Sequence, residues 1–241
     1  GKYAIIGEAA CDYWMEKRGL SFRRTRDLDV VLLIEAFDKT FSSLVWDFVR
    51  EGRYGISATQ PVEGTHFRFD GPQASGYPRM IELFCRRPDR IVLAAGQTAA
   101  PVMVDGESAS LSAILLDDDY YGLIRRHVVQ DGGLSILDID GLVALKARAW
   151  LNINGDIRDG KVSDRHDLNK HRNDVFRLGA IMPDSPAPEI SDSIRLNVLA
   201  FLDSFPTDSP EWPSIIQALR STLPAATSGN VGVIDAALRR R

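Results

Sequence analysis

Two aspartates separated by one residue begin an apolar run near the start of the chain. The segment RDLDVVLLIE contains Asp27 and Asp29, followed by the Val, Leu and Ile residues typical of a buried strand. Alternate residues of a strand point to the same side, about 6.6 Å apart, so the two carboxylates share one face. They repel each other unless a cation lies near, and the hard cation Mg²⁺ prefers oxygen ligands. The pattern indicates a metal site; the alternative is a solvated strand start paired with Arg24 or Arg26.

A third carboxylate interrupts a later apolar segment. Residues 79–86, RMIELFCR, have the composition of a strand, and Glu82 lies in its middle. A charged side chain in an apolar strand is costly unless it is paired or takes part in chemistry. We therefore expect Glu82 to meet Asp27 and Asp29 at one open cleft. The alternative is an outward-facing residue that pairs with an arginine such as Arg68.

The elements expected around these carboxylates change in character along the chain. Besides the strand that starts at Asp27, the patterns predict strands at 3–6, 54–59, 65–70 and 79–86 and helices at 9–18 and 37–52. The stretch from about 88 to 137 could add short strands at IVLA, PVMVDG and LSIL and a helix at DDDYYGLIRRHV. From about residue 138 the apolar residues recur with helical spacing. We therefore predict an α/β first half and a helical C-terminal region.

The composition excludes several classes of protein. The chain has 241 residues, 44% hydrophobic and 26% charged, which is typical of a globular protein. A net charge of −4 argues against an overall basic nucleic-acid binder, and two cysteines without a C-x-x-C argue against a disulfide framework or a Cys-based zinc site. No apolar run approaches the ~18 residues of a membrane span, so we expect a cytoplasmic protein with no membrane partner. The four histidines lack zinc-site spacing and are interpreted as ordinary surface or helix residues.

The first of these segments resembles a known superfamily. In IIGEAACDYW…RRTRDLDVVL, an apolar residue and Gly7 precede a helix and then the Asp27–Asp29 strand. This order is similar to that of the nucleotidyltransferases related to DNA polymerase β, in which a third acid, here Glu82, lies on a later strand. The resemblance implies a mixed sheet with flanking helices over residues 1–100. It also implies that one or two Mg²⁺ ions, held by the three acids, assist transfer of a nucleoside monophosphate from a nucleoside triphosphate to an acceptor hydroxyl.

The second half is similar to the helical part of the AbiEii-like abortive-infection nucleotidyltransferases. In that group L-x-x-x-K-x-x-A precedes K-D-x-x-D-L. Here LVALKARAW supplies Lys146, and SDRHDL supplies Asp164 and Asp167, with Ser163 in place of the lysine. Lys161 or Lys170 could compensate for that lysine, although neither is in register. The likeness implies connecting strands and a helix over 101–137 and a helical region over 138–241. Lys146 would neutralise the outer phosphates, and its alternative role is that of a surface lysine. A toxin–antitoxin or phage-defence function is implied, with an RNA or protein acceptor and a possible antitoxin partner.

One residue departs from the superfamily pattern. Glu8 follows Gly7 where those enzymes have Gly or Ser, and its carboxylate would repel a triphosphate unless it points away or joins the metal ligands. It could also act as a built-in phosphate mimic at the start of the helix. Gly7, Glu8, Arg24 and Thr25 are nucleotide-binding candidates, together with the two aspartates of SDRHDL. Glu8 and Ser163 leave two alternatives open: a catalytically silent fold that serves as a binding or regulatory module, and an unrelated α/β protein.

Overall fold

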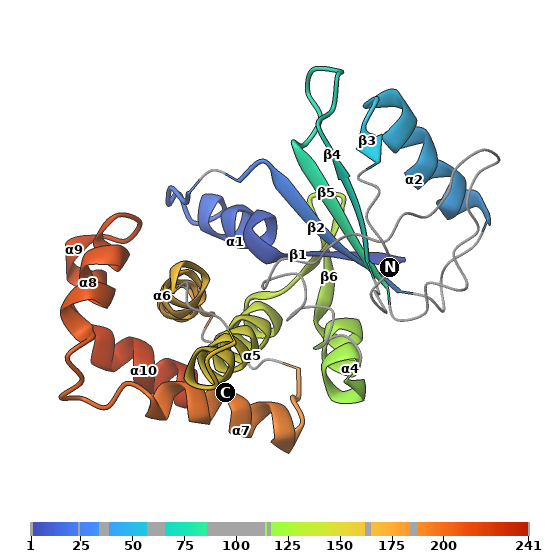
Figure 1. The fold of residues 1–241 in the computed structure, drawn as a ribbon. Helices are drawn as coiled ribbons and strands as arrows, with labels where there is room; N and C mark the ends of the chain where they lie inside the picture. The colour runs from blue at the N-terminus through green and yellow to red at the C-terminus, as the bar shows by residue number, and fades with distance from the viewer. Residues whose placement is uncertain are drawn as a thin grey trace.

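A computed structural model describes residues 2–23, 25–33, 39–56, 66–85, 114, 117–161, 165–183 and 188–240. The chain folds as an α/β protein in which a mixed sheet and its covering helices are followed by a group of helices (Figure 1). The predicted α/β class and helical second half are therefore confirmed. In the described part of the chain, no helix is both long and apolar enough to cross a membrane.

Seven strands of the described residues form one sheet. They are β1 (Tyr3–Ile6), β2 (Asp27–Leu32), β3 (Gly55–Ile56), β4 (His66–Asp70), β5 (Met80–Cys85), β6 (Val128–Asp131) and β7 (Leu134–Leu137). Their order across the sheet is β3-β4-β5-β2-β1-β7-β6. β2 is antiparallel to β1 and parallel to β5, and β1 is parallel to β7. The two strands that carry the predicted acids are thus neighbours at the centre of the sheet.

The helices differ from the sequence prediction mainly at their ends. They are α1 (Gly7–Glu16), α2 (Lys39–Glu51), α4 (Asp118–His127), α5 (Ile139–Arg158), α6 (His166–Ala180), α7 (Asp192–Asp203), α8 (Trp212–Arg220), α9 (Ala225–Ser228) and α10 (Val231–Arg239). α1 begins two residues earlier than expected, directly after β1. The predicted strand LSIL is β7 and DDDYYGLIRRHV contains α4, whereas IVLA and PVMVDG lie outside the described residues.

The side chains of β2 and β5 alternate between two hydrophobic cores. Val31 and Phe84 belong to the larger core, which α1, α5 and the following helices share, and Val30 belongs to the smaller core beneath α2. Because alternate residues of a strand share a face, Asp29 and Glu82 lie on the side of the larger core. Figure 1 shows α2 on one side of the sheet and α1 with the helical half on the other.

Helix α5 joins the sheet to the helical half. It packs against α1, α4, α6 and α7. Its start is fixed by Asp138, whose side chain accepts hydrogen bonds from the backbone N–H of Gly141 at 2.8 Å and from Nδ1 of His127 at 3.0 Å. A helix buried on most sides must be apolar on most sides, so the lysine at position 146 requires an explanation.

Candidate active site

A cleft of about 300 Å³ lies where the starts of β2 and β5 face the start of α1 and the helices α5 and α6. It brings together seven of the residues that the sequence singled out. Its lining comprises Ile6, Gly7, Glu8, Thr25, Asp27, Asp29, Arg79, Met80, Glu82, Phe84, Leu142, Leu145, Lys146, Ala149, Lys170 and His171. Residues of the strands form one wall, here called the strand wall. The other wall, here called the helix wall, is formed by residues of α1, α5 and α6 and by the segment before β2.

The strand wall carries the three predicted carboxylates. Asp29 and Glu82 are direct partners in the parallel β2–β5 pair, and Asp27 lies two residues before Asp29 on the same strand. Neighbouring strands are about 4.8 Å apart, so Asp29 and Glu82 are adjacent on one face. The structure therefore brings the three acids to one cleft, as the alternation of the two strands predicts.

Two of these acids are paired with arginines. Asp27 accepts hydrogen bonds from Nε and Nη2 of Arg79 at 3.2 and 3.0 Å. Glu82 is buried, accepts a hydrogen bond from Nε of Arg68 at 2.8 Å across the β4–β5 pair, and lies 2.7 Å from Nη2 of the same guanidinium. The partner considered for Glu82 is thus present, whereas Asp27 is held by Arg79 rather than by Arg26. Arg24 lies outside the described residues.

Thr25 and Gly7 fix the backbone around Asp27 and Asp29. Oγ1 of Thr25 accepts a hydrogen bond from the backbone N–H of Asp27 at 3.1 Å. Gly7 has a φ of +65°, and a Cβ at this position would lie 1.9 Å from Oδ2 of Asp29. Only glycine therefore combines this turn with the close approach of the Asp29 carboxylate to the start of α1. Negative charge is favoured there by the helix dipole.

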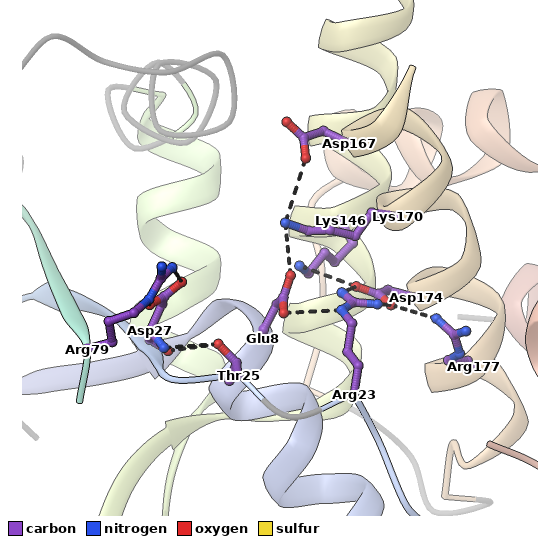
Figure 2. A network of polar contacts seen from close by, with 10 residues as sticks. All are labelled: Glu8, Arg23, Thr25, Asp27, Arg79, Lys146, Asp167, Lys170, Asp174 and Arg177. Atoms are coloured by element: carbon purple, nitrogen blue, oxygen red, sulfur yellow. Dashed lines mark hydrogen bonds and ion pairs between the residues drawn. The ribbon is translucent and has the colours of Figure 1, made fainter. Parts of the chain in front are cut away.

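Glu8 neither points away from the cleft nor joins the three acids. Its carboxylate lies 3.1 Å from Nε of Arg23 and 2.9 Å from Nζ of Lys170 (Figure 2). Burial alone would raise the pKa of the Glu8 carboxyl, but the hydrogen bonds and charges of Arg23 and Lys170 outweigh it and lower the pKa to about 2. Glu8 is therefore an anion held by two cations on the helix wall.

Asp174 is the buried centre of the helix wall. Its carboxylate is fully buried and accepts hydrogen bonds from Nη1 and Nη2 of Arg23 at 2.8 and 2.6 Å and from Nη1 of Arg177 at 3.1 Å. Nζ of Lys146 lies 3.5 Å away (Figure 2). Burial would raise the pKa of Asp174, but the charge of Lys146 and the hydrogen bonds of Arg23 lower it to about 2. The lysine inside α5 is thus explained: Lys146 is buried, lines the cleft and is not a surface lysine.

Among the α6 residues that reach the helix wall, the sequence interpretation considered Lys170 only as an out-of-register substitute for the lysine that Ser163 replaces, and it missed the roles of His171 and Asp174. Lys170 and His171 line the cleft, and Asp174 holds Lys146. Asp167 lies 3.8 Å from Lys170 but is not part of the lining, and Asp164 lies outside the described residues. A signal for the missed residues exists in KHRNDV, because Lys170 and Asp174 have the same spacing as the lysine and second aspartate of K-D-x-x-D-L. This register is seven residues later than the one based on SDRHDL.

The strand wall offers the type of donor atom that a hard divalent cation prefers. Within the residues that the structure describes, no group of three or more His, Cys, Asp or Glu side chains is arranged to hold a metal ion. Asp27 and Glu82 instead face arginines in this arrangement. Carboxylate oxygens on one face of two adjacent strands, however, are the ligands that Mg²⁺ prefers. Gly7 provides the open space in which the Asp29 carboxylate sits.

Comparisons of the chain with protein-family models, with curated proteins and with solved structures found no match. The function of the cleft must therefore be inferred from its own residues and their geometry.

Proposed function

We propose that the chain is a Mg²⁺-dependent nucleotidyltransferase that moves a nucleoside monophosphate from a nucleoside triphosphate to an acceptor hydroxyl. The observation that carries this proposal is the pairing of Asp29 with Glu82 on adjacent parallel strands, in a cleft whose opposite wall contains Lys146 and Lys170. A wall of carboxylates facing a wall of lysines suits a polyphosphate that binds together with a divalent cation. An ordinary acidic pocket would lack the lysines, and an ordinary anion site would lack the acids.

The roles of the residues follow from their positions in the cleft. Asp27, Asp29 and Glu82 would hold one or two Mg²⁺ ions, which when bound supply charge neutralisation to the phosphates and to the leaving pyrophosphate. Lys146 and Lys170 would bind the outer phosphate oxygens from the opposite wall. Glu82, which lies beside Asp29 on the adjacent strand, would accept the proton of the acceptor hydroxyl.

The order of elements also supports the proposal. A strand, the Gly7 turn, a helix, the Asp27–Asp29 strand and a later strand with Glu82 follow one another as the resemblance to the nucleotidyltransferases implies. On α6, Lys170 and Asp174 fit the K-D-x-x-D-L pattern of the AbiEii-like group, with His171 at the first aspartate. We therefore extend the proposal to a toxin–antitoxin or phage-defence setting, in which RNA or protein would be the acceptor.

Calorimetry and a transfer assay test the proposal. We expect each suitable nucleoside triphosphate to bind in Mg²⁺ and not in EDTA, and α-labelled nucleotide to be transferred to RNA or protein from a cell extract. Asp29→Asn should abolish transfer while the protein stays folded by circular dichroism. Glu16→Gln, at the exposed end of α1, is the matched control and should retain both binding and transfer. Absence of Mg²⁺-dependent binding by the folded wild type would exclude the proposal.

A catalytically silent binding module is the second candidate. It is favoured by one observation, the internal pairing of the acids: Arg79 holds Asp27, Arg68 holds Glu82, and two cations hold Glu8. A cleft neutralised in this way needs no ion to be stable. Nucleotide binding without transfer to any acceptor, unchanged by Asp29→Asn, would favour this candidate over the enzyme.

A further inference from the structure

The position of Glu8 has a consequence for any anionic ligand of the cleft. Its carboxylate is four-fifths buried, lines the cleft and contacts both Nε of Arg23 and Nζ of Lys170. It is also the second residue of α1, where the unpaired backbone N–H groups and the helix dipole favour negative charge. Two cations and a helix start thus converge on one carboxylate (Figure 2).

The two cations have other partners that would keep them in place without Glu8. Arg23 also donates two hydrogen bonds to the buried Asp174, and Lys170 lies 3.8 Å from Asp167 on its own helix. Removal of the Glu8 carboxylate would therefore leave both cations positioned at the cleft. Glu8 is the member of the network that can be exchanged for another anion without dismantling the rest.

We propose that Glu8 is an internal competitor that blocks the polyphosphate site of this cleft, so that an anionic ligand must displace it from Arg23 and Lys170. This inference rests on the proposed function in one respect, because it takes the cleft to be a polyphosphate site. It goes beyond that function in assigning a built-in restraint: the resting protein binds polyphosphate weakly, and the site becomes fully competent when the Glu8 side chain turns away.

Protonation does not release this block at the pH of a cell. Arg23 and Lys170 hold the pKa of Glu8 near 2, so the carboxylate stays charged throughout the physiological range. The other charged groups around it, Asp174, Lys146 and Asp167, are likewise fixed in ion pairs. Release must therefore come from competition, either by the ligand itself or by a cationic group of a partner that draws Glu8 out of the cleft.

Titration calorimetry with inorganic tripolyphosphate and Mg²⁺ tests the block separately from nucleotidyl transfer. We expect Glu8→Gln, which keeps the shape and removes the charge, to bind at least about tenfold more tightly than the wild type, equivalent to about 1.4 kcal/mol. Glu8→Ser, which removes the same charge but leaves a smaller side chain, should show the same gain in tripolyphosphate affinity. Glu16→Gln, on the same helix but exposed, should bind as the wild type does. Adding Lys170→Met to Glu8→Gln should remove the gain, because the cation that Glu8 occupies is then missing.

Each outcome decides between the inference and the proposed function. Equal or weaker binding by folded Glu8→Gln and Glu8→Ser, or no binding by any protein, would overturn the internal competitor. A gain in tripolyphosphate affinity without any nucleotidyl transfer would support the competitor and exclude the enzyme. If the wild type transfers nucleotide and binds tripolyphosphate as tightly as Glu8→Gln does, the enzyme is supported and the internal competitor is overturned.

Discussion

Both walls of the cleft contain ion pairs between a carboxylate and a cationic side chain, but the pairs differ in their exposure to water. On the strand wall, Asp27 pairs with Arg79 where the side chains are 30% and 67% exposed. On the helix wall, Asp174 pairs with Lys146 where they are 0% and 5% exposed. An exposed ion pair contributes little because water screens it. A buried one contributes little as a pair, but the loss of one partner leaves an unpaired charge in a low-dielectric interior.

This difference assigns separate tasks to the two walls. On the strand wall, the exposed Asp27 can exchange Arg79 for another cation at small cost, which a site for a transient metal or ligand requires. The network around the buried Asp174 cannot be rearranged cheaply, and it ties the segment before β2, α5 and α6 together. We infer that the exposed pair of the strand wall serves ligand exchange and that the buried Asp174 network of the helix wall maintains the shape of the cleft.

The largest expected effect comes from removing the buried carboxylate of the helix wall. Asp174→Ala leaves the charges of Arg23, Lys146 and Arg177 without their shared partner. We expect the free energy of unfolding to fall by about 3–5 kcal/mol, measured by urea denaturation. Asp27→Ala on the strand wall is the matched control and should have a much smaller effect. Similar losses for the two variants would remove the distinction between the walls.

Gly7 and Gly19 have nearly the same φ, so alanine substitutions at the two positions can distinguish the cost of backbone strain from the cost of close packing. Gly7 and Gly19 have φ values of +65° and +68°, but a Cβ would clash with Asp29 only at Gly7 and has open space at Gly19. We expect Gly19→Ala to cost about 1 kcal/mol of unfolding free energy. Gly7→Ala should cost roughly 2–3 kcal/mol, because the Asp29 carboxylate must also move.

A double-mutant cycle identifies the source of the extra cost at Gly7. Asp29→Ala removes the carboxylate that the new Cβ would meet, so Gly7→Ala in that background should cost no more than Gly19→Ala. If the cost of Gly7→Ala is unchanged by Asp29→Ala, the strain lies in the α1 turn and not in the approach of the acid.

The sequence predicted the strand wall better than the helix wall for a physical reason. The faces of β2 and β5 follow from strict alternation, so Asp29 and Glu82 could be assigned to one side without coordinates. The α6 cluster depends on how two long helices pack, which periodicity does not specify. The contact of Asp174 with Lys146 therefore became evident only when α6 was seen against α5, and it is this contact that selects the KHRNDV register over that of SDRHDL.

For the overall architecture too, sequence patterns predicted local elements better than the contacts between them. The α/β class and the helical second half follow from strand-like and helix-like patterns. Strand β6 (VVQD) was missed because four residues without alternation gain their structure from pairing with β7, which lies beyond a two-glycine turn. His171 was treated as ordinary, because neither its spacing nor its neighbours in the sequence mark it as a cleft residue.

Lowering the pH should reduce the free energy of unfolding by an amount between the effects expected for Gly7→Ala and for Arg79→Gln. The pKa of Glu8 falls from its ordinary value of 4.5 to about 2 in the folded protein. The corresponding stability is therefore fully present above pH 4.5 and is lost as the pH falls toward 2. Because the carboxylate is partly exposed, we expect about 1–2 kcal/mol after solvent screening.

Comparison of the wild type with Glu8→Gln isolates this contribution. The difference in unfolding free energy between the two proteins should be largest near neutral pH and should disappear as the pH falls through about 2, as followed by urea denaturation at a series of pH values. Glu16→Gln, at the exposed end of the same helix, is the matched control for the substitution itself. A difference that is constant with pH would mean that the substitution disturbs packing and that the charge of Glu8 contributes nothing.

The smallest effect on stability is expected at the exposed arginine of the strand wall. Arg79→Gln removes the cation that holds Asp27, yet both side chains reach water, so the free energy of unfolding should not change measurably. Mg²⁺ affinity should instead rise severalfold, because the carboxylate no longer has a competing partner; calorimetry with Mg²⁺ alone measures this. Arg50→Gln, which removes another exposed pair, with Asp47 on α2, is the control and should leave Mg²⁺ affinity unchanged. A fall in Mg²⁺ affinity for Arg79→Gln would show that Arg79 orients Asp27 for the ion, and the strand wall would then be a fixed structure like the helix wall.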